Sequence, residues 1–169
     1  MGTQTTPPNQ VIMSLALFLT IFIMMPTLEK SWDQGIRPFI DGEIEEKEAF
    51  SKSTAPVREF MLKHVREKDL KIFLDASGEG LLEKPSDIPL KTLIPAFMIS
   101  ELRRAFEIGF LVFIPFLVID MVVASVLMSM GMMMLPPIII ALPFKIIFFV
   151  LVDGWFLISG SLLESFNTG

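Results

Sequence analysis

The sequence predicts an all-α fold in which kinked, hydrophobic helical hairpins carry a polar helical insert. Hydrophobic residues make up 52% of the chain and include 16 Phe and 12 Met, and the mean hydropathy is +0.62. Apolar runs at 11–25 and 108–128 lie on either side of a polar stretch at 27–90, which contains most of the charged side chains. A methionine-rich turn interrupts the apolar C-terminal part. This pattern is typical of a chain that packs in or against a membrane.

The composition also excludes several classes of function. The net charge is -5 and no dense basic cluster is present, whereas nucleic-acid binding requires a positive surface that displaces counterions. The absence of Cys excludes disulfides and thiolate metal sites. The sequence contains no phosphate-binding glycine loop, no HExxH and no nucleophile elbow. We therefore expect no catalytic, cofactor-binding or metal-ligating residue, and no enzymatic activity.

The first segment, residues 1–26, begins with an extended polar stretch and continues into an apolar helix. The apolar run Val11–Met25 is expected to end at Pro26, because proline cannot continue a helix from its N-terminal side. Fifteen residues of helix span about 22 Å, which is less than the roughly 30 Å hydrocarbon core of a bilayer. We therefore expect this helix to be buried among other helices.

Residues 27–95 form the predicted polar insert. A short helix is expected over 43–50, and a second is expected to begin at Pro56, since proline suits the first helical turn. The glycines at 78 and 80 end it, and prolines punctuate an irregular connection up to residue 95. An apolar stripe at helical spacing runs along the second helix: Val57, Phe60, Met61, Val65 and Ile72. His64, the single histidine, has no ligand-type neighbour and is assigned no role.

Residues 96–169 form the predicted C-terminal hydrophobic hairpin. A charged collar opens it, with Glu101 and Arg104 spaced to pair on one helical turn. The following run, Ile108–Met128, is long enough to cross a bilayer, and Pro115 is expected to kink it.

A methionine turn connects the two arms of this hairpin. Gly131 is conformationally permissive, and Pro136 and Pro137 cannot donate backbone hydrogen bonds, so the pattern predicts helix, irregular turn, helix. Methionine has a flexible, polarizable side chain, and its most frequent use is to fill gaps in a core. The alternative is a deformable apolar constriction that is closed at rest. The turn consists of Met130, Gly131, Met132, Met133, Met134, Leu135, Pro136 and Pro137.

Three ionisable groups interrupt the apolar arms: Asp120, Lys145 and Asp153. Asp120 lies about eleven residues before Gly131, and Lys145 lies about eight after Pro137, so an antiparallel hairpin could place them at similar depth. Buried charges without partners are rare, which favours structural pairs or subunit contacts. A proton or ion path is the alternative.

Several blocks resemble one known family, in the same order and over nearly the whole chain. These blocks are Thr6-Pro7-Pro8-Asn9-Gln10-Val11, Arg58-Glu59-Phe60-Met61, Ser100-Glu101-Leu102, Phe106-Glu107-Ile108-Gly109-Phe110, Phe113-Ile114-Pro115-Phe116-Leu117, Gly131-Met132-Met133-Met134-Leu135-Pro136-Pro137, Leu142-Pro143-Phe144-Lys145 and Val150-Leu151-Val152-Asp153-Gly154-Trp155. The chain resembles the FliP/SctR family. The Asn-Gln-Val sequence after Pro-Pro is more similar to its flagellar branch than to its virulence-injectisome branch.

The resemblance implies a core subunit of a type III protein export gate, which forms a pore for unfolded flagellar proteins. Family members assemble as several copies with FliQ-like and FliR-like subunits into a hetero-oligomeric helical channel. FlhB-like and FlhA-like proteins engage it, and a FliO-like protein assists assembly. The location implied is the bacterial inner membrane at the flagellar basal body, with the insert and helices largely on the extracytoplasmic side.

The resemblance also assigns roles to residues. The family's pore gasket corresponds here to Met132, Met133 and Met134, on the turn backbone of Gly131, Pro136 and Pro137. Its functional charges correspond to Glu101, Asp120 and Lys145. Apart from the resemblance, Asp153 is expected as a further buried or functional charge.

One departure from the family pattern is a missing cleaved signal and preceding apolar segment, so the sequence is expected to be a fragment. Alternatives to the flagellar gate are an injectisome export-gate subunit, a proton-coupled transporter subunit that uses Asp120 and Asp153, and an inert scaffold.

Overall fold

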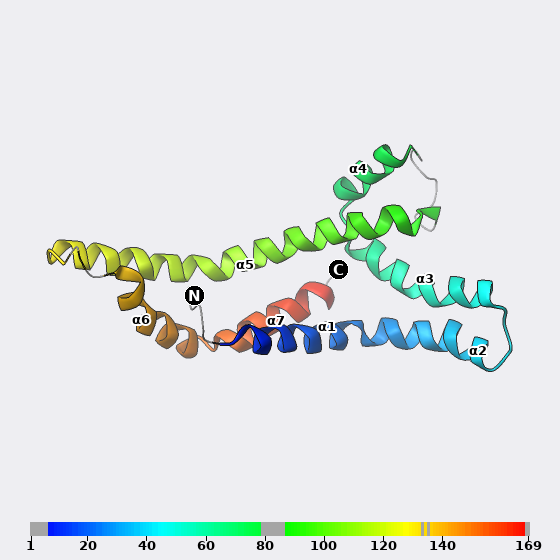
Figure 1. Cartoon of the computed structure of the whole chain (residues 1–169), viewed down its shortest axis with the longest axis horizontal. Coiled ribbons are helices and arrows are strands. Elements are labelled where there is room, and N and C mark those ends of the chain that lie inside the picture. The colour runs from blue at the N-terminus through cyan, green and yellow to red at the C-terminus, as the bar shows by residue number, and fades with distance from the viewer. Residues whose placement is uncertain (1–6, 79–86, 133, 135, 168–169) are drawn as a thin grey trace. The chain divides into compact units, whose positions relative to one another are not determined.

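The computed structural model describes residues 7–78, 87–132, 134 and 136–167. The described residues form helices and no strand, which confirms the all-α prediction (Figure 1). The elements are α1 (Asn9–Ser31), the π-helical segment η1 (Trp32–Ile36), α2 (Arg37–Ile40), α3 (Glu46–His64), α4 (Glu67–Ser77), α5 (Leu90–Ser129), α6 (Pro137–Leu151) and α7 (Gly154–Asn167).

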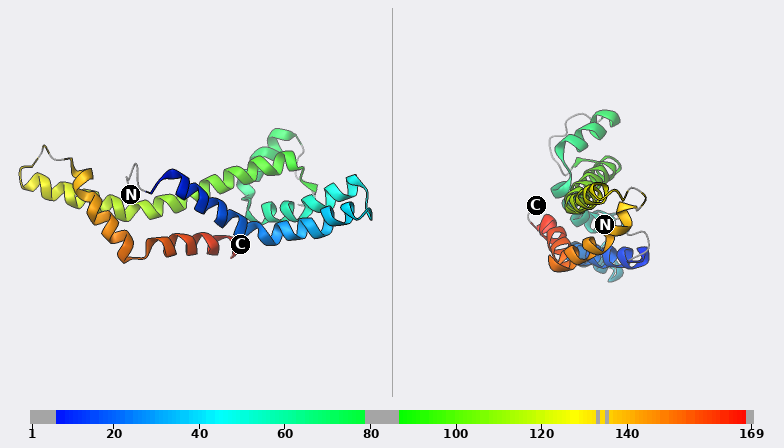
Figure 2. Two further views of the ribbon diagram at one scale, coloured as in Figure 1. Left: turned by 60° about the horizontal axis from the view of Figure 1, so that its bottom comes forward. Right: turned by 90° about the vertical axis from the view of Figure 1, so that its left-hand side faces the viewer.

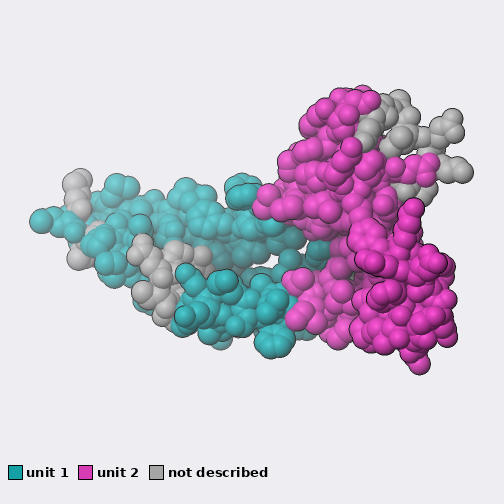
Figure 3. Space-filling view, turned by 45° about the vertical axis from the view of Figure 1, so that its right-hand side comes forward, with its two compact units in different colours: residues 1–19, 105–168 teal, residues 20–104, 169 magenta. Residues whose placement is uncertain are grey.

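The chain divides into two compact units, coloured separately in Figure 3. Unit 1 comprises residues 1–19 and 105–168, and unit 2 comprises residues 20–104 and 169. The division falls inside α1 and α5, so each of these helices contributes to both units. The segments predicted from the sequence, 1–26, 27–95 and 96–169, follow chain order instead and stay a prediction.

The first helix is longer than the sequence predicted. The expectation that it ends at Pro26 is wrong, because α1 continues through this proline to Ser31, and η1 and α2 extend the helical path to Ile40. A proline inside a helix removes one backbone hydrogen bond, whereas ending the helix would leave several carbonyls without partners. The 32 residues Asn9–Ile40 are long and apolar enough to cross a membrane, so the argument from short length fails.

The helices of the insert also have different bounds from those predicted. α3 starts at Glu46 and passes through Pro56, which therefore lies mid-helix and does not begin a new one. The chain then breaks at Val65 and Arg66, whose ψ angles of 140° and 136° are extended. The predicted apolar stripe is consequently divided, and Ile72 on α4 is exposed. Gly78 ends α4 with a left-handed φ of 71°, which confirms its expected role as a turn residue.

The core of unit 2 joins α3, α4 and the start of α5. It consists of the buried residues Met61, Leu74, Ile88 and Leu93. Arg58 closes one side by donating a hydrogen bond to the Ile88 carbonyl oxygen. His64 is buried against this core, with its Nδ1 atom 2.8 Å from the Phe60 carbonyl oxygen and its ring 4.4 Å from the Phe60 ring. The histidine is thus a packed residue, as its isolation in the sequence suggested.

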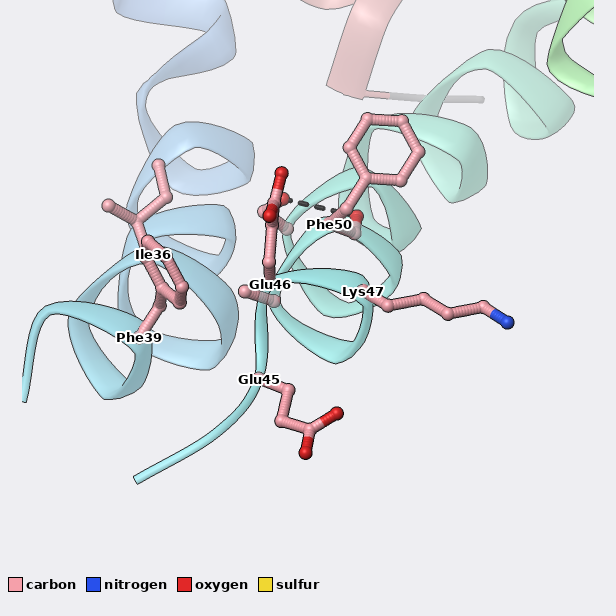
Figure 4. Close-up of a pocket in the computed structure, with 8 residues that line it drawn as sticks. Ile36, Phe39, Glu45, Glu46, Lys47 and Phe50 are labelled. Carbon is pink, nitrogen blue, oxygen red and sulfur yellow. Dashed lines mark hydrogen bonds between the residues drawn. The ribbon is translucent and has the colours of Figure 1, made fainter. Parts of the chain in front are cut away.

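A close approach between η1 and α3 shapes the other part of unit 2. A Cβ at Gly35 would lie 2.5 Å from the Ser53 backbone nitrogen, so only glycine allows this contact. Next to it lies an open cleft of about 760 Å³, shown in Figure 4. Ile36 and Phe39 line it from the η1–α2 side, and Phe50 lines it from α3.

The long helix α5 begins earlier than predicted and is unbroken over 40 residues, or about 60 Å. The connection expected up to residue 95 is therefore wrong in its second part, because α5 starts at Leu90 and contains Pro95. Pro115 also lies within α5 and does not end it. Length and composition are sufficient for α5 to cross a membrane.

Unit 1 contains the predicted C-terminal hairpin, visible from a second direction in Figure 2. Phe116 of α5 packs against Phe148 and Phe149 of α6, with ring centroids 6.0 and 6.3 Å apart. α6 and α7 meet at a 60° bend, and together they are apolar enough to form a broken membrane span. Gly154 allows this bend, because a Cβ there would lie 2.2 Å from the Phe149 ring.

Replacing Gly35 tests the contact between η1 and α3. Gly35→Ala should destabilise unit 2 by about 1–3 kcal/mol, because the new methyl group overlaps backbone atoms of Ser53, which cannot rotate away. Hydrogen exchange of the α3 backbone amides measures this. Gly160→Ala on α7 is the matched control, since nothing lies within 4 Å of its Cβ position. Unchanged α3 exchange in Gly35→Ala would contradict the contact.

Candidate functional site

The methionine turn starts from a capped helix end. Gly131 adopts a left-handed φ of 72° directly after α5. Its N–H donates to the Met128 carbonyl oxygen over 3.1 Å, and the Met132 N–H donates to the Leu127 carbonyl oxygen over 3.0 Å. This pair of bonds is a Schellman motif, which satisfies carbonyls that the helix end would leave without partners. The direction in which the chain enters the turn is therefore fixed by the backbone.

The second arm begins at the two prolines. Pro136 has extended backbone angles and precedes the helix, and Pro137 is the first residue of α6, where the missing N–H has no helical partner to lose. The predicted helix, turn, helix arrangement is confirmed by α5 and α6.

The described methionines of the turn are exposed. The exposed fraction is 61% for Met130, 36% for Met132 and 98% for Met134. Met133 and Leu135 lie outside the described residues. The described methionine side chains thus do not fill a core of this chain, which removes the gap-filling interpretation for them. They form an exposed apolar surface at the end of the hairpin.

An ion pair joins the two arms of the hairpin behind this turn. Lys145 on α6 donates to the Asp120 Oδ2 atom on α5 over 2.6 Å. Lys145 is buried and Asp120 is partly buried. Each member lies one helical turn from an aromatic ring of the hairpin core, Phe116 on α5 and Phe149 on α6. Apolar surroundings weaken solvent screening, so neither charge is stable there without the other.

The other predicted charges occupy different surroundings. Glu101 pairs with Arg104 over 3.1 Å, as the spacing predicted, and lies in unit 2. Asp153 is exposed at the α6–α7 bend, where it adopts a positive φ of 49°. Asp153 is thus not buried within this chain, and its expected role as a buried or functional charge stays a prediction. The structure brings together only Asp120 and Lys145 among the predicted charges of the described hairpin.

Sequence reasoning missed two buried polar residues, Asp69 and Ser100. They contact each other across α4 and α5 at 2.7 Å. Asp69 lies in the first turn of α4, where acidic side chains are favoured, and this position was the available signal. Ser100 carries no comparable signal, because its partner is 31 residues away.

An apolar groove of about 480 Å³ runs along α5 and α6 near the turn. Its lining residues are aliphatic apart from one phenylalanine: Val118, Ile119, Val122, Val123, Val126, Leu127, Ile140 and Phe144. Among the described residues, no group of His, Cys, Asp and Glu could hold a metal ion. The described site therefore offers apolar contact and one ion pair.

Comparison with known proteins decides the family. The model of the FliP family matches residues 1–162, which include the turn and both charges of the pair. The chain belongs to the FliP family. This confirms the resemblance seen in the sequence blocks, and it agrees with the expectation that the chain is not an enzyme.

Three relatives, each named flagellar biosynthetic protein FliP, show how far the similarity extends. The chain is 60% identical to the Caulobacter vibrioides protein over 168 residues, which cover 99% of this chain and 63% of the relative. It is 58% identical to the Bacillus subtilis protein, and the match covers 98% of this chain and 75% of that relative. It is 54% identical to the Cereibacter sphaeroides protein, and the match covers 98% of this chain and 55% of that relative. The chain thus spans between about half and three quarters of the length of these FliP relatives.

Substituting Gly131 tests the backbone of the turn. Gly131→Ala should destabilise the turn by about 1–2 kcal/mol, because a left-handed φ brings Cβ close to the following carbonyl oxygen. Faster hydrogen exchange of the Met132 amide reports this loss. Gly109→Ala, on α5 and with open space around its Cβ position, should leave the exchange rate of that amide unchanged. An equal response to both substitutions would contradict the capping role.

A double-mutant cycle tests the ion pair. Lys145→Met should destabilise the hairpin by about 3–5 kcal/mol, because it leaves the Asp120 carboxylate in apolar surroundings without its cation. The double variant with Asp120→Asn should be more stable than the sum of the single effects predicts. Unfolding in detergent measures both. Asp153→Asn is the exposed control, with an expected effect within about 0.5 kcal/mol. Additive single effects would show that no direct pair forms.

Proposed function

We propose that the chain is a core subunit of the flagellar type III protein export gate. In this proposal several copies surround a pore for unfolded flagellar proteins, and Met132, Met133 and Met134 form its apolar constriction. The observation that carries the proposal is the exposure of Met132 and Met134 on a turn held between two apolar helices. The names of the relatives support the flagellar branch over the injectisome branch.

Methionine suits such a constriction for a physical reason. An unfolded substrate presents every kind of side chain, so the seal cannot depend on one specific partner. A thioether on a flexible, unbranched chain can repack around different shapes. An apolar ring also resists ion flow when no substrate is present, because a narrow hydrophobic constriction loses its water. The mechanism is conduction through a regulated pore and involves no covalent step.

Assembly with other subunits follows from the exposed apolar surface. The candidate span within Asn9–Ile40 has none of its window buried inside the chain, and that within Leu90–Ser129 has 11% buried. A surface of this kind requires lipid or protein partners. We propose further copies of this chain, FliQ-like and FliR-like subunits and membrane lipid. FlhB-like and FlhA-like export proteins engage the assembled gate, and a FliO-like factor assists its formation.

The ion pair contributes to the same assembly. The Asp120 Oδ1 atom is buried and has no hydrogen-bond partner among the described residues, although Oδ2 is bound by Lys145. The Asp120 side chain as a whole is 27% exposed beside the buried Lys145, so a neighbouring subunit can contact this end of the ion pair. We place the gate in the bacterial inner membrane at the flagellar basal body, with residues 27–95 on the extracytoplasmic side. Glu101, on α5 just after that segment, is proposed as a second assembly charge.

Thinning the methionine ring tests the proposed constriction. Met132→Ala with Met133→Ala should increase small-ion leakage through the assembled gate, because two shorter side chains leave the pore wider at rest. Conductance across membranes that contain the full complex measures the leakage. The matched control is the double variant Met121→Ala with Met128→Ala, which removes two exposed methionines from α5 and none from the turn.

Assembly must be compared in the same preparations, by the mass of the complex after gentle detergent extraction. A discrete multimer of normal mass with increased leakage supports the constriction. A multimer of normal mass with unchanged leakage contradicts it, and a chain that remains monomeric in the presence of its proposed partners contradicts the gate itself.

A further inference from the structure

A hydroxyl group on α5 completes the N-terminal cap of α4. Arg66 is the residue before the first turn of α4, and its N–H donates to the Ser100 Oγ atom over 3.1 Å. The Ser100 hydroxyl donates to the Asp69 Oδ2 atom over 2.7 Å. In an ordinary capping box, the acidic side chain in the third position of the helix accepts the N–H of the capping residue directly. Here Ser100 stands between the two groups, so the cap is closed by a residue from another helix.

The carboxylate at the centre of this contact is held from both helices. On α4, the Arg66 guanidinium binds Asp69 with two nitrogens, Nε at 2.8 Å and Nη2 at 2.7 to 2.9 Å. On α5, the charge of Arg103, one turn after Ser100, also favours the ionised carboxylate. The hydrogen bond from Ser100, followed by that from Arg66, lowers the pKa of Asp69 below its ordinary value. Asp69 is therefore charged at neutral pH, although only 4% of its surface is exposed.

The single proton of the Ser100 hydroxyl has two possible acceptors. One is Asp69, and the other is the carbonyl oxygen of Ala96 on its own helix, at 3.0 Å. An ionised carboxylate is the stronger acceptor, so the hydroxyl donates across to α4 while Asp69 is in place. If α4 moves away, the hydroxyl can turn to Ala96 and remain satisfied. The contact is thus specific when formed, and its serine is not left unpaired when it opens.

We propose that Ser100 is a positioning residue that fixes how α4 docks on α5, and thereby attaches the polar insert to the helix that carries Glu101. Apolar contact is not directional, so it does not by itself fix the register of α4 on α5, whereas the contact of Arg66, Ser100 and Asp69 forms in one register. The effect of this attachment on export rests on the proposed function, while the docking itself does not.

Hydrogen exchange in the full-length polypeptide, purified in detergent, tests the docking. Ser100→Ala should raise the exchange rate of the Arg66 amide and of the first-turn amides of α4 about tenfold or more, because a capping acceptor is lost and a buried carboxylate loses a donor. Ser125→Ala is the matched control. Its hydroxyl lies on the same helix and donates to the Met121 carbonyl oxygen at 2.8 Å, without contacting α4 in the part of the chain that the structure describes. In this control the exchange rates of the α4 amides should stay within about twofold of those in the unsubstituted protein.

A cycle with Asp69→Asn keeps the test decisive if Ser100→Ala unfolds the whole unit. Asp69→Asn should raise the exchange rates of the same amides. In the double variant these rates should not exceed those of the more affected single variant, since both substitutions remove the same contact. The proposal is overturned if the exchange rates of these amides stay within about twofold of the unsubstituted protein in both single variants. It is also overturned if the effects of the two single substitutions are fully additive in the double variant. An equal increase in Ser125→Ala also overturns it.

Flagellar export in cells then tests the coupling separately. Ser100→Ala should reduce export and Ser125→Ala should not. If the α4 amides exchange faster in Ser100→Ala while export stays normal, the docking of α4 on the helix that carries Glu101 is not needed for export, and the functional coupling is overturned. Loosened α4 amides, together with unchanged leakage in the Met132 and Met133 double variant, would overturn the proposed constriction and leave the docking role of Ser100 in place.

Discussion

The need to pair every backbone N–H and C=O group shapes this structure more than the local preferences of its residues do. Five prolines lie inside helices that continue through them: Pro26, Pro56, Pro95, Pro115 and Pro143. Each proline removes one hydrogen bond, whereas each additional helix end would leave up to four donors or acceptors unsatisfied. In the helices apolar enough to cross a membrane that difference is large, because lipid cannot replace the lost bonds. Two of the helix ends have a left-handed glycine cap, at Gly78 and Gly131.

The capped end at Gly131 in turn makes the buried ion pair possible. The turn reverses the chain, so that Phe116 packs on Phe148 and Phe149. This packing places Lys145 next to Asp120, 25 residues away in the sequence. A buried pair of this kind adds little net stability, because desolvation of both charges offsets their attraction. Its effect is on specificity, since any other alignment of the two helices leaves a charge without a partner.

The sequence predicts a feature well when its cause is local. The helical class, the turn at Gly131, the capping role of Gly78 and the pairing of Glu101 with Arg104 all follow from short-range patterns. The contact of Asp120 with Lys145 was also within reach, because both could be counted from one turn. Helix bounds near proline were wrong, since the cost of a helix end depends on its surroundings. Ser100 was missed because nothing near it in the sequence indicates Asp69. The exposure of Asp153 within this chain shows that an apolar neighbourhood in sequence is not burial in space.

Two aspartates thus connect α5 to other helices. In unit 1, Asp120 of α5 binds Lys145 of α6, and in unit 2, Asp69 of α4 accepts a hydrogen bond from Ser100 of α5. In a soluble protein, apolar burial alone would select much of the correct packing. In α1, α5 and α6 the exposed surface is as apolar as the buried surface, so lipid would offer these helices equally apolar surroundings. Apolar contact therefore discriminates poorly between correct and incorrect neighbours. A polar contact that is satisfied in one arrangement discriminates strongly, because each wrong arrangement leaves a buried donor, acceptor or charge unpaired. A few buried polar side chains can in this way determine which helices of such a chain pair, and in which register.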